Sequence, residues 1–197
     1  GLLGGSLSQA NSTFQPAISS QTLGSYTGNA MNFVSRDNMP GTFASTNFSS
    51  VTTFVVYKQT SQSPRNVIFV NGTGANGNVL DNTGSQFRTN HNPSLITVSS
   101  LNSSTMSNKP LLFVSSGTSS SSYDATWYLN SVGPFTGTKT SDTTTSVSTT
   151  FQCGNDDGAS AGNGYIFEIL QYNKVLNSTD ADNVINYLKA KYQYSTW

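Results

Sequence analysis

Short apolar runs recur along the chain with the alternation typical of β-strands, and clusters of turn residues separate them. From about residue 30 onward this pattern predicts a sandwich or a barrel, because no helical segments alternate with the strands. Six runs are the clearest: Val51–Lys58, Asn66–Asn71, Leu111–Ser115, Ala125–Asn130, Val147–Cys153 and Tyr165–Tyr172. Apolar residues fall on both faces of the first run, so we expect a central strand that is covered on both sides.

The run Tyr165–Tyr172 is the strongest of the six. Strict alternation divides its side chains between two faces, with Tyr165, Phe167 and Ile169 on one face and Ile166, Glu168, Leu170 and Tyr172 on the other. The pattern therefore predicts that Glu168 shares its face with the apolar Leu170 and the aromatic Tyr172.

After this run the apolar period changes from 2 to about 3.6 residues. Ala181, Val184, Ile185, Leu188 and Tyr192 form one stripe, which predicts an amphipathic helix over residues 178–192 that packs on the sandwich. Asn177 is the expected N-cap, and Asp180 follows three positions later. Lys189 and Lys191 fall in the last turn, where their charges complement the helix dipole.

Residues 1–28 are rich in Ser, Gln, Gly and Asn, with only scattered apolar residues. We expect an extended arm or an irregular first layer here, and an arm of this kind could dock on a neighbouring subunit. The remaining residues, 29–197, are expected to form one domain that includes the helix. The first five residues lack the basic and long apolar stretches of a signal peptide.

Composition narrows the classes of function. Charged residues make up 9% of the chain, nine basic against nine acidic, so no strong field attracts phosphate or anionic lipid. This balance argues against nucleic-acid binding through a basic patch. No apolar run approaches the roughly 18 residues that a membrane span requires, so none is expected.

Neutral polar residues replace the missing charges. Ser, Thr and Asn fill 78 of the 197 positions, yet 35% of the residues are hydrophobic and these lie in clusters, which favours a folded all-β domain over disorder. The one cysteine, Cys153, excludes an intrachain disulfide and a cysteine-rich metal cluster. We expect Cys153 to be a half-buried strand thiol.

The last third of the chain carries a recognisable arrangement of motifs. Gly164-Tyr165-Ile166-Phe167-Glu168 leads to Tyr172-Asn173, then to Leu176 and the segment 177–180, and the helix ends with Tyr187-Leu188-Lys189-Ala190-Lys191-Tyr192. This order resembles the end of concanavalin A-like (laminin-G-like) jelly-roll domains. Phe54–Lys58 resembles their early central strand, and Trp127–Asn130 a strand that ends in an Asn turn. The resemblance is closest over residues 145–195 and is absent before about residue 30.

The resemblance implies two antiparallel sheets packed face to face as a jelly-roll sandwich, with the helix appended. It does not imply one activity, because this fold hosts lectins, carbohydrate-binding modules, polysaccharide hydrolases, lyases, and structural domains of phages and viruses.

Catalytic motifs of the family's enzymes are missing from the sequence. A glycoside hydrolase needs two carboxylates about the scissile bond, but Glu168 is the only glutamate and no Glu-x-Asp-x-x-Glu strand occurs. In the family, a glutamate in the penultimate strand is commonly structural. Lyase chemistry would rely on the single histidine, His91, which reads as a loop residue, and on only three arginines: Arg36, Arg65 and Arg88. We therefore expect no enzymatic activity.

Two kinds of binding site remain as hypotheses. Aromatic rings can stack on sugars, and the candidates are Trp127, Tyr128, Tyr123, Tyr57 and Tyr26, with core packing as the alternative for each. Oxygen ligands suited to calcium cluster at Asn155, Asp156, Asp157 and Asn163, although Asp-Asp-Gly is equally good turn chemistry. No cofactor other than this calcium is expected.

Together these features predict a non-enzymatic domain at the surface of a virion or a cell, or otherwise extracellular, with a structural or attachment role and glycan contact. Subunits of viral and phage shells fold in a reducing compartment but work outside it, which suits a chain without disulfides. Neighbouring structural subunits are the other expected partners. The alternatives are a secreted polysaccharide-active enzyme or its carbohydrate-binding module, and a purely architectural domain without any ligand.

Overall fold

The computed structural model describes the strands and the C-terminal helix together with some of the segments that connect them. The described residues are 5–7, 12–34, 37–43, 50–60, 66–71, 78–82, 87–91, 94–98, 110–118, 122–129, 132–139, 150–154, 163–194 and 197. They form fourteen strands, one 3-10 helix and one α-helix. The predicted all-β class with a C-terminal helix is thereby confirmed.

The strands form two antiparallel sheets of seven strands each. Sheet A runs in the order β12 (Val132–Lys139), β11 (Ser122–Leu129), β10 (Pro110–Thr118), β5 (Ser50–Gln59), β14 (Gly164–Tyr172), β3 (Tyr26–Phe33) and β2 (Ala17–Leu23). Sheet B runs in the order β1 (Gly5–Leu7), β4 (Asn38–Phe43), β13 (Thr150–Gly154), β6 (Asn66–Asn71), β7 (Asn78–Asn82), β8 (Phe87–His91) and β9 (Ser94–Val98). The 3-10 helix η1 spans Ser12–Phe14, and the helix α2 spans Ser178–Tyr192.

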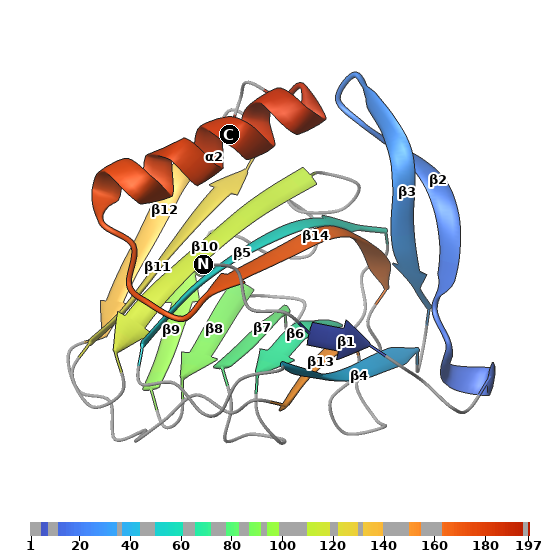
Figure 1. Ribbon diagram of the computed structural model, residues 1–197, viewed down its shortest axis with the longest axis horizontal. Coiled ribbons are helices and arrows are strands. Elements are labelled where there is room, and N and C mark those ends of the chain that lie inside the picture. The colour runs from blue at the N-terminus through green and yellow to red at the C-terminus, as the bar shows by residue number, and fades with distance from the viewer. Residues whose placement is uncertain are drawn as a thin grey trace.

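Three layers result, with α2 on one face of sheet A and sheet B on the other face, as Figure 1 shows. The central strand β5 is buried on both faces, since every residue from Val51 to Tyr57 is buried. This confirms the covered central strand that the sequence predicts. An apolar cluster fills the space between sheet A and α2, and its buried members are Leu23, Phe54, Val56, Leu112, Leu176, Ile185, Leu188, Tyr192 and Trp197.

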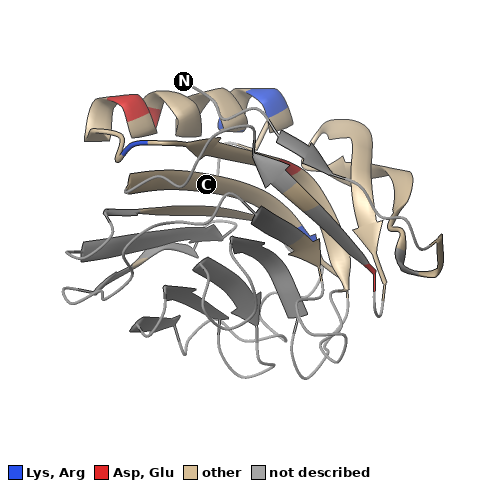
Figure 2. Cartoon of the chain, turned by 60° about the horizontal axis from the view of Figure 1, so that its bottom comes forward, with Lys and Arg blue, Asp and Glu red and all other residues tan. Residues whose placement is uncertain are grey.

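Helix α2 has the predicted bounds and the predicted cap. The Asn177 side chain accepts a 2.8 Å hydrogen bond from the backbone N–H of Asp180, so it occupies an otherwise unpaired donor of the first turn. Figure 2 shows acidic residues near the start of α2 and basic residues near its end, as the helix dipole favours. Ile185, Leu188 and Tyr192 of the apolar stripe are buried, while Ala181 and Val184 are partly buried against the cluster.

Thr52 on β5 holds the loop that leads from β14 into α2. Its hydroxyl donates a 2.9 Å hydrogen bond to the carbonyl of Lys174 and accepts a 3.0 Å bond from the N–H of Leu176. Leu176 is itself buried in the cluster beneath the helix. The central strand therefore fixes where the helix begins.

The N-terminal segment differs from the expected arm. Residues 17–33 form a β-hairpin, β2–β3, at the edge of sheet A, and the proposed boundary at residue 28 falls inside β3. The two strands meet at Gly24 and Ser25, and Gly24 has a φ of 61°, which is the conformation a tight hairpin of this kind requires. Ser, Thr and Gln pair well along an edge strand even without an apolar run, so hydrophobicity alone does not reveal it.

Other boundaries also shift. Leu111–Ser115 extends to β10, Tyr165–Tyr172 gains Gly164, and the strand predicted from Ala125 begins at Ser122. His91 was expected in a loop but is the last residue of β8, opposite Asn78 and Ser94. The first residues of the run predicted at 147–153 lie outside the described residues, and β13 begins at Thr150.

Cys153 on β13 is fully buried, and burial raises the pKa of its thiol to about 12. This goes further than the half-buried strand thiol that the sequence predicts. Within the described part of the chain, no helix combines the length and the apolar character needed to cross a bilayer.

Candidate functional site

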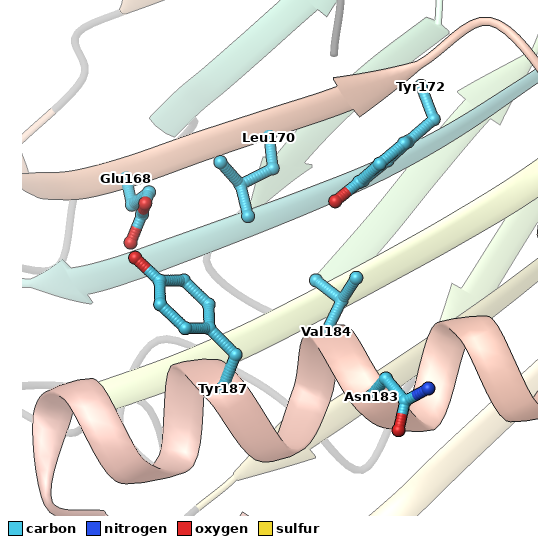
Figure 3. Close-up of a pocket in the computed structure, with 6 residues that line it drawn as sticks. All are labelled: Glu168, Leu170, Tyr172, Asn183, Val184 and Tyr187. Atoms are coloured by element: carbon cyan, nitrogen blue, oxygen red, sulfur yellow. The ribbon is translucent and has the colours of Figure 1, made fainter. Parts of the chain in front are cut away.

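A groove of about 390 Å³ lies between β14 and α2. Its lining comprises Glu168, Leu170 and Tyr172 from the strand and Asn183, Val184 and Tyr187 from the helix. Figure 3 shows the three strand side chains extending toward the helix, with Val184 and Tyr187 extending back toward the strand. This volume lies within the range of roughly 300 to 1,000 Å³ typical of small-molecule sites.

A β-bulge places the strand residues on the face toward the helix. The register of β14 against β5 shifts between Ile166 and Glu168. Directly opposed residues share a face, so Ile166, opposite Tyr57, and Ile169, opposite Val55, lie on the same side of the sheet. The strict alternation predicted for this strand is therefore wrong across the bulge, although it correctly groups Glu168 with Leu170 and Tyr172.

Phe167 also departs from its predicted face. Its ring packs edge-on against the Tyr192 ring, with 5.9 Å between the ring centroids, and also packs against the cluster beneath the helix. Because the bulge inserts one unpaired position, Phe167 and Glu168 both reach the helix side. The bulge thus brings a carboxylate and an aromatic ring to the same place.

Glu168 is tied to the last turn of α2 by two hydrogen bonds to one oxygen. Its Oε2 accepts from Lys191 Nζ and from the Tyr192 hydroxyl, each at 2.9 Å. The Glu168 side chain is only 15% exposed. This is the structural role that the resemblance implies for the glutamate of the penultimate strand.

Lys191 lies between Glu168 and two aromatic rings. Its Nζ is 5.6 Å from the ring centroid of Tyr187 and 5.4 Å from that of Tyr192. Partial burial lowers the pKa of Lys191, but the hydrogen bond and charge of Glu168, aided by Tyr187, outweigh it and raise the pKa above its usual value. Lys191 therefore stays charged and remains paired with Glu168 at neutral pH.

Two tyrosines near Glu168, Tyr172 and Tyr192, stay protonated. Burial, followed by the negative charge of Glu168 and the nearby Tyr187, raises the pKa of Tyr172. Burial and Glu168 raise the pKa of Tyr192 further. At neutral pH both hydroxyls keep their proton, and the Tyr192 hydroxyl donates its proton to Glu168.

Hydrolytic chemistry would need more than the groove provides. Retaining and inverting glycosidases both use two carboxyl groups across the scissile bond. Of the six residues that line this groove, Glu168 alone carries a carboxylate, and one of its oxygens is already engaged. What the groove does combine is aromatic and aliphatic surface with a few polar groups, which suits ligand binding.

Of the aromatic residues singled out from the sequence, Tyr57 and Tyr26 have described side chains, and neither lines this groove. Trp127, Tyr128 and Tyr123 belong to β11, whose backbone is described but whose side chains at these positions are not. Tyr57 is 2% exposed and its hydroxyl donates to the carbonyl of Asn163 at 3.0 Å, so its ring offers no face to a ligand. Tyr26 is partly buried and packs edge-on against Tyr192 at 4.9 Å.

Of the four predicted calcium ligands, the structure describes Asn163. Asn155, Asp156 and Asp157 lie outside the described residues. Asn163 is described, and its carbonyl accepts hydrogen bonds from Tyr57 and from the N–H of Thr60. No cluster of three or more metal-ligating His, Cys, Asp or Glu side chains occurs within the described ranges.

Sequence reasoning missed Tyr172, Asn183 and Tyr187 as site residues. Spacing relates the residues within each element, since Asn183 and Tyr187 are four positions apart on one helix, but the contact between the strand and the helix depends on the three-layer packing. One signal was present, because Tyr187 falls outside the apolar stripe of the helix and is 51% exposed.

No protein-family model matches the chain, and no curated protein matches it in sequence. Solved structures do resemble it in fold. The binding domain of botulinum neurotoxin DC in complex with SialylT has a TM-score of 0.64 and 15% identity, covering 94% of this chain and 46% of that one. The botulinum neurotoxin serotype G binding domain has a TM-score of 0.62 and 10% identity, covering 95% of this chain and 47% of that one.

A third structure concerns the dependence of botulinum neurotoxin type C cell entry on interaction with two ganglioside molecules. Its TM-score is 0.63 at 14% identity, and the match covers 94% of this chain and 47% of that one. This chain therefore spans about half the length of the structures that it resembles. At such low identity the likeness establishes a shared β-sandwich fold, and the first two of these neighbours are binding domains.

Proposed function

We propose that the chain is a concanavalin A-like jelly-roll domain that binds a glycan without catalysing a reaction, in an attachment or structural role at the surface of a virion or a cell. The observation that carries this proposal is the fold likeness, over 94% of the chain, to a neurotoxin binding domain in complex with SialylT and to a neurotoxin structure whose description names ganglioside molecules. Because fold alone does not define function, the groove chemistry must support the same conclusion.

The groove between β14 and α2 is the proposed glycan site. Tyr172 and Tyr187 supply aromatic surface and hydroxyl groups, Asn183 supplies an amide, and Glu168 supplies a carboxylate. Sugars present hydroxyl groups and apolar C–H faces, and a site for them combines these same two kinds of surface.

A second partner of the proposed domain is a neighbouring structural subunit. The edge strand β2 carries no charged residue, and Ile18 on it is 64% exposed. An uncharged edge strand with unpaired backbone groups is suited to contact with another chain. Sedimentation velocity over a range of concentrations tests this part, and a chain that stays monomeric throughout would remove it.

Binding of the purified chain to an array of neutral and acidic oligosaccharides tests the main proposal, with unfolded protein as the control. We expect at least one glycan class to be retained. In parallel, each retained glycan is incubated with the chain and its products are analysed by chromatography. Release of shorter sugars would favour the polysaccharide-active enzyme instead, and an array without any signal would leave only an architectural role.

A further inference from the structure

We infer that the groove between β14 and α2 selects a neutral sugar and rejects acidic ones. This inference rests on the proposed glycan binding and adds the chemical class of the ligand. It rests on the charges of the six lining residues and on the hydrogen-bonding groups among them that a ligand can contact.

The first observation is the uneven use of the Glu168 carboxylate. Lys191 Nζ and the Tyr192 hydroxyl both donate to Oε2. Neither of these two bonds engages Oε1, and a carboxylate oxygen is an acceptor only. A ligand in the groove therefore meets an acceptor that prefers an O–H or N–H donor, such as a sugar hydroxyl.

The second observation concerns cations. None of the described residues that line the groove carries a positive charge. The nearest described cation, Lys191, is already paired with Glu168 and lies beside the rings of Tyr187 and Tyr192. Lys174, on the loop before the helix, pairs with Asp180 at 3.5 Å. A ligand carboxylate would therefore face Glu168 without a free counter-charge.

The third observation is the surface between the polar groups. Leu170 and Val184 line the groove together with the two tyrosine rings, while Asn183 adds an amide that can both donate and accept. Figure 3 shows the Tyr187 hydroxyl pointing toward the Glu168 carboxylate, and the Tyr172 ring extending from the opposite side with its hydroxyl toward the middle of the groove. A neutral pyranose, with apolar C–H groups between hydroxyls, matches this arrangement.

Like charges brought together across an interface disfavour the wrong partner, so Glu168 acts here as a specificity residue. An acidic sugar in the groove either places its carboxylate near the Glu168 carboxylate, which repels it, or binds in a position where its hydroxyl groups form fewer hydrogen bonds with the lining residues. The two sugar classes should then differ in affinity at this site although they present similar hydroxyl groups.

The test compares lactose with sialyllactose, which differ by one acidic sugar, using calorimetric titration of the full chain. We expect lactose to bind at least about tenfold more tightly, the effect of about 1.4 kcal/mol. Sialyllactose binding as tightly as lactose would overturn the inference, while the proposed glycan binding would stand. If neither sugar nor any array glycan binds, the proposed function fails as well.

Two variants locate the binding. Asn183→Ala should weaken lactose binding roughly three- to tenfold, the effect of one hydrogen bond. Asn186→Ala is the matched control, because Asn186 is exposed on the same helix and does not line the groove. Equal lactose affinity of both variants would show that the sugar binds elsewhere and would overturn the inference.

Glu168→Gln tests the charge itself. The amide keeps the shape of the side chain and removes the negative charge, so sialyllactose should gain relative to lactose. An unchanged ratio of the two affinities would contradict the role given to Glu168. Circular dichroism of each variant establishes that it is folded, and the comparison of the two sugars on the unaltered chain decides the outcome independently.

Discussion

The hydroxyl of Tyr192, on the last turn of α2, donates a 2.9 Å hydrogen bond to Oε2 of Glu168 on β14. The tyrosine is 1% exposed, so this bond forms where water competes little. Together with the Lys191 ion pair, it fastens the end of the helix to the strand that lines the groove. The shape of the groove therefore depends on this contact.

We expect the Tyr192–Glu168 bond to contribute about 1.5–3 kcal/mol to the free energy of unfolding, as hydrogen bonds to charged groups do. Tyr192→Phe, Glu168→Gln and the double variant form a cycle whose coupling energy urea unfolding can measure. Strictly additive effects would show that the two residues stabilise the chain independently.

Thr52→Val should destabilise the chain by about 1–3 kcal/mol, because the N–H of Leu176 and the carbonyl of Lys174 would both lose their partner near the core. Thr22→Val is the matched control. The Thr22 hydroxyl forms an exposed hydrogen bond with the Thr27 hydroxyl, at 3.1 Å, so removing it should change stability by less than about 0.5 kcal/mol. If both variants change the free energy of unfolding equally in chemical denaturation, the two hydrogen bonds of Thr52 do not stabilise the loop as expected.

Gln193→Gly should stabilise the chain by about 0.5–1 kcal/mol. Gln193 follows the helix with a φ of 52°, a left-handed conformation that favours glycine. Its N–H bonds to the carbonyl of Ala190, and the N–H of Tyr194 bonds to that of Lys189, which is the usual helix-ending pattern. Gln193→Ala keeps the strain and should leave the melting temperature unchanged. A lower melting temperature for the glycine variant would refute the strain.

The Cys153 thiol should resist alkylation in the folded chain and react rapidly in denaturant, because it is fully buried and its pKa is raised to about 12. In the unfolded chain the thiol ionises near pH 9. The stability that follows from the raised pKa is thus present below pH 9 and declines as the pH rises toward 12.

Unfolding measured between pH 8 and 11 checks this sign. The raised pKa values of Tyr57 and Tyr192 act in the same direction at higher pH. Cys153→Ala should therefore flatten the decline without abolishing it. Rapid labelling of the native thiol would show that β13 opens readily.

Elements whose signals are local can be predicted from the sequence alone. Helix α2, with its Asn177 cap, requires only neighbouring residues to specify it, and the structure has the predicted bounds 178–192. The buried central strand β5 is similarly evident, because apolar residues on both faces of a strand require cover on both sides. The all-β class followed from these runs and the turn residues between them.

Strand register and the contact between β14 and α2 are evident only from the three-dimensional structure. The bulge after Ile166 depends on pairing with β5, and it determines which side chains of β14 face the helix. The polar hairpin β2–β3 is held at the edge of sheet A by backbone hydrogen bonds. The pattern of apolar residues does not predict this pairing. The groove joins residues of β14 and α2 that no short spacing connects. Local propensity and periodicity depend on residues a few positions apart, whereas register and packing depend on segments that are distant in the sequence. The groove forms through register and packing, so local signals do not predict it.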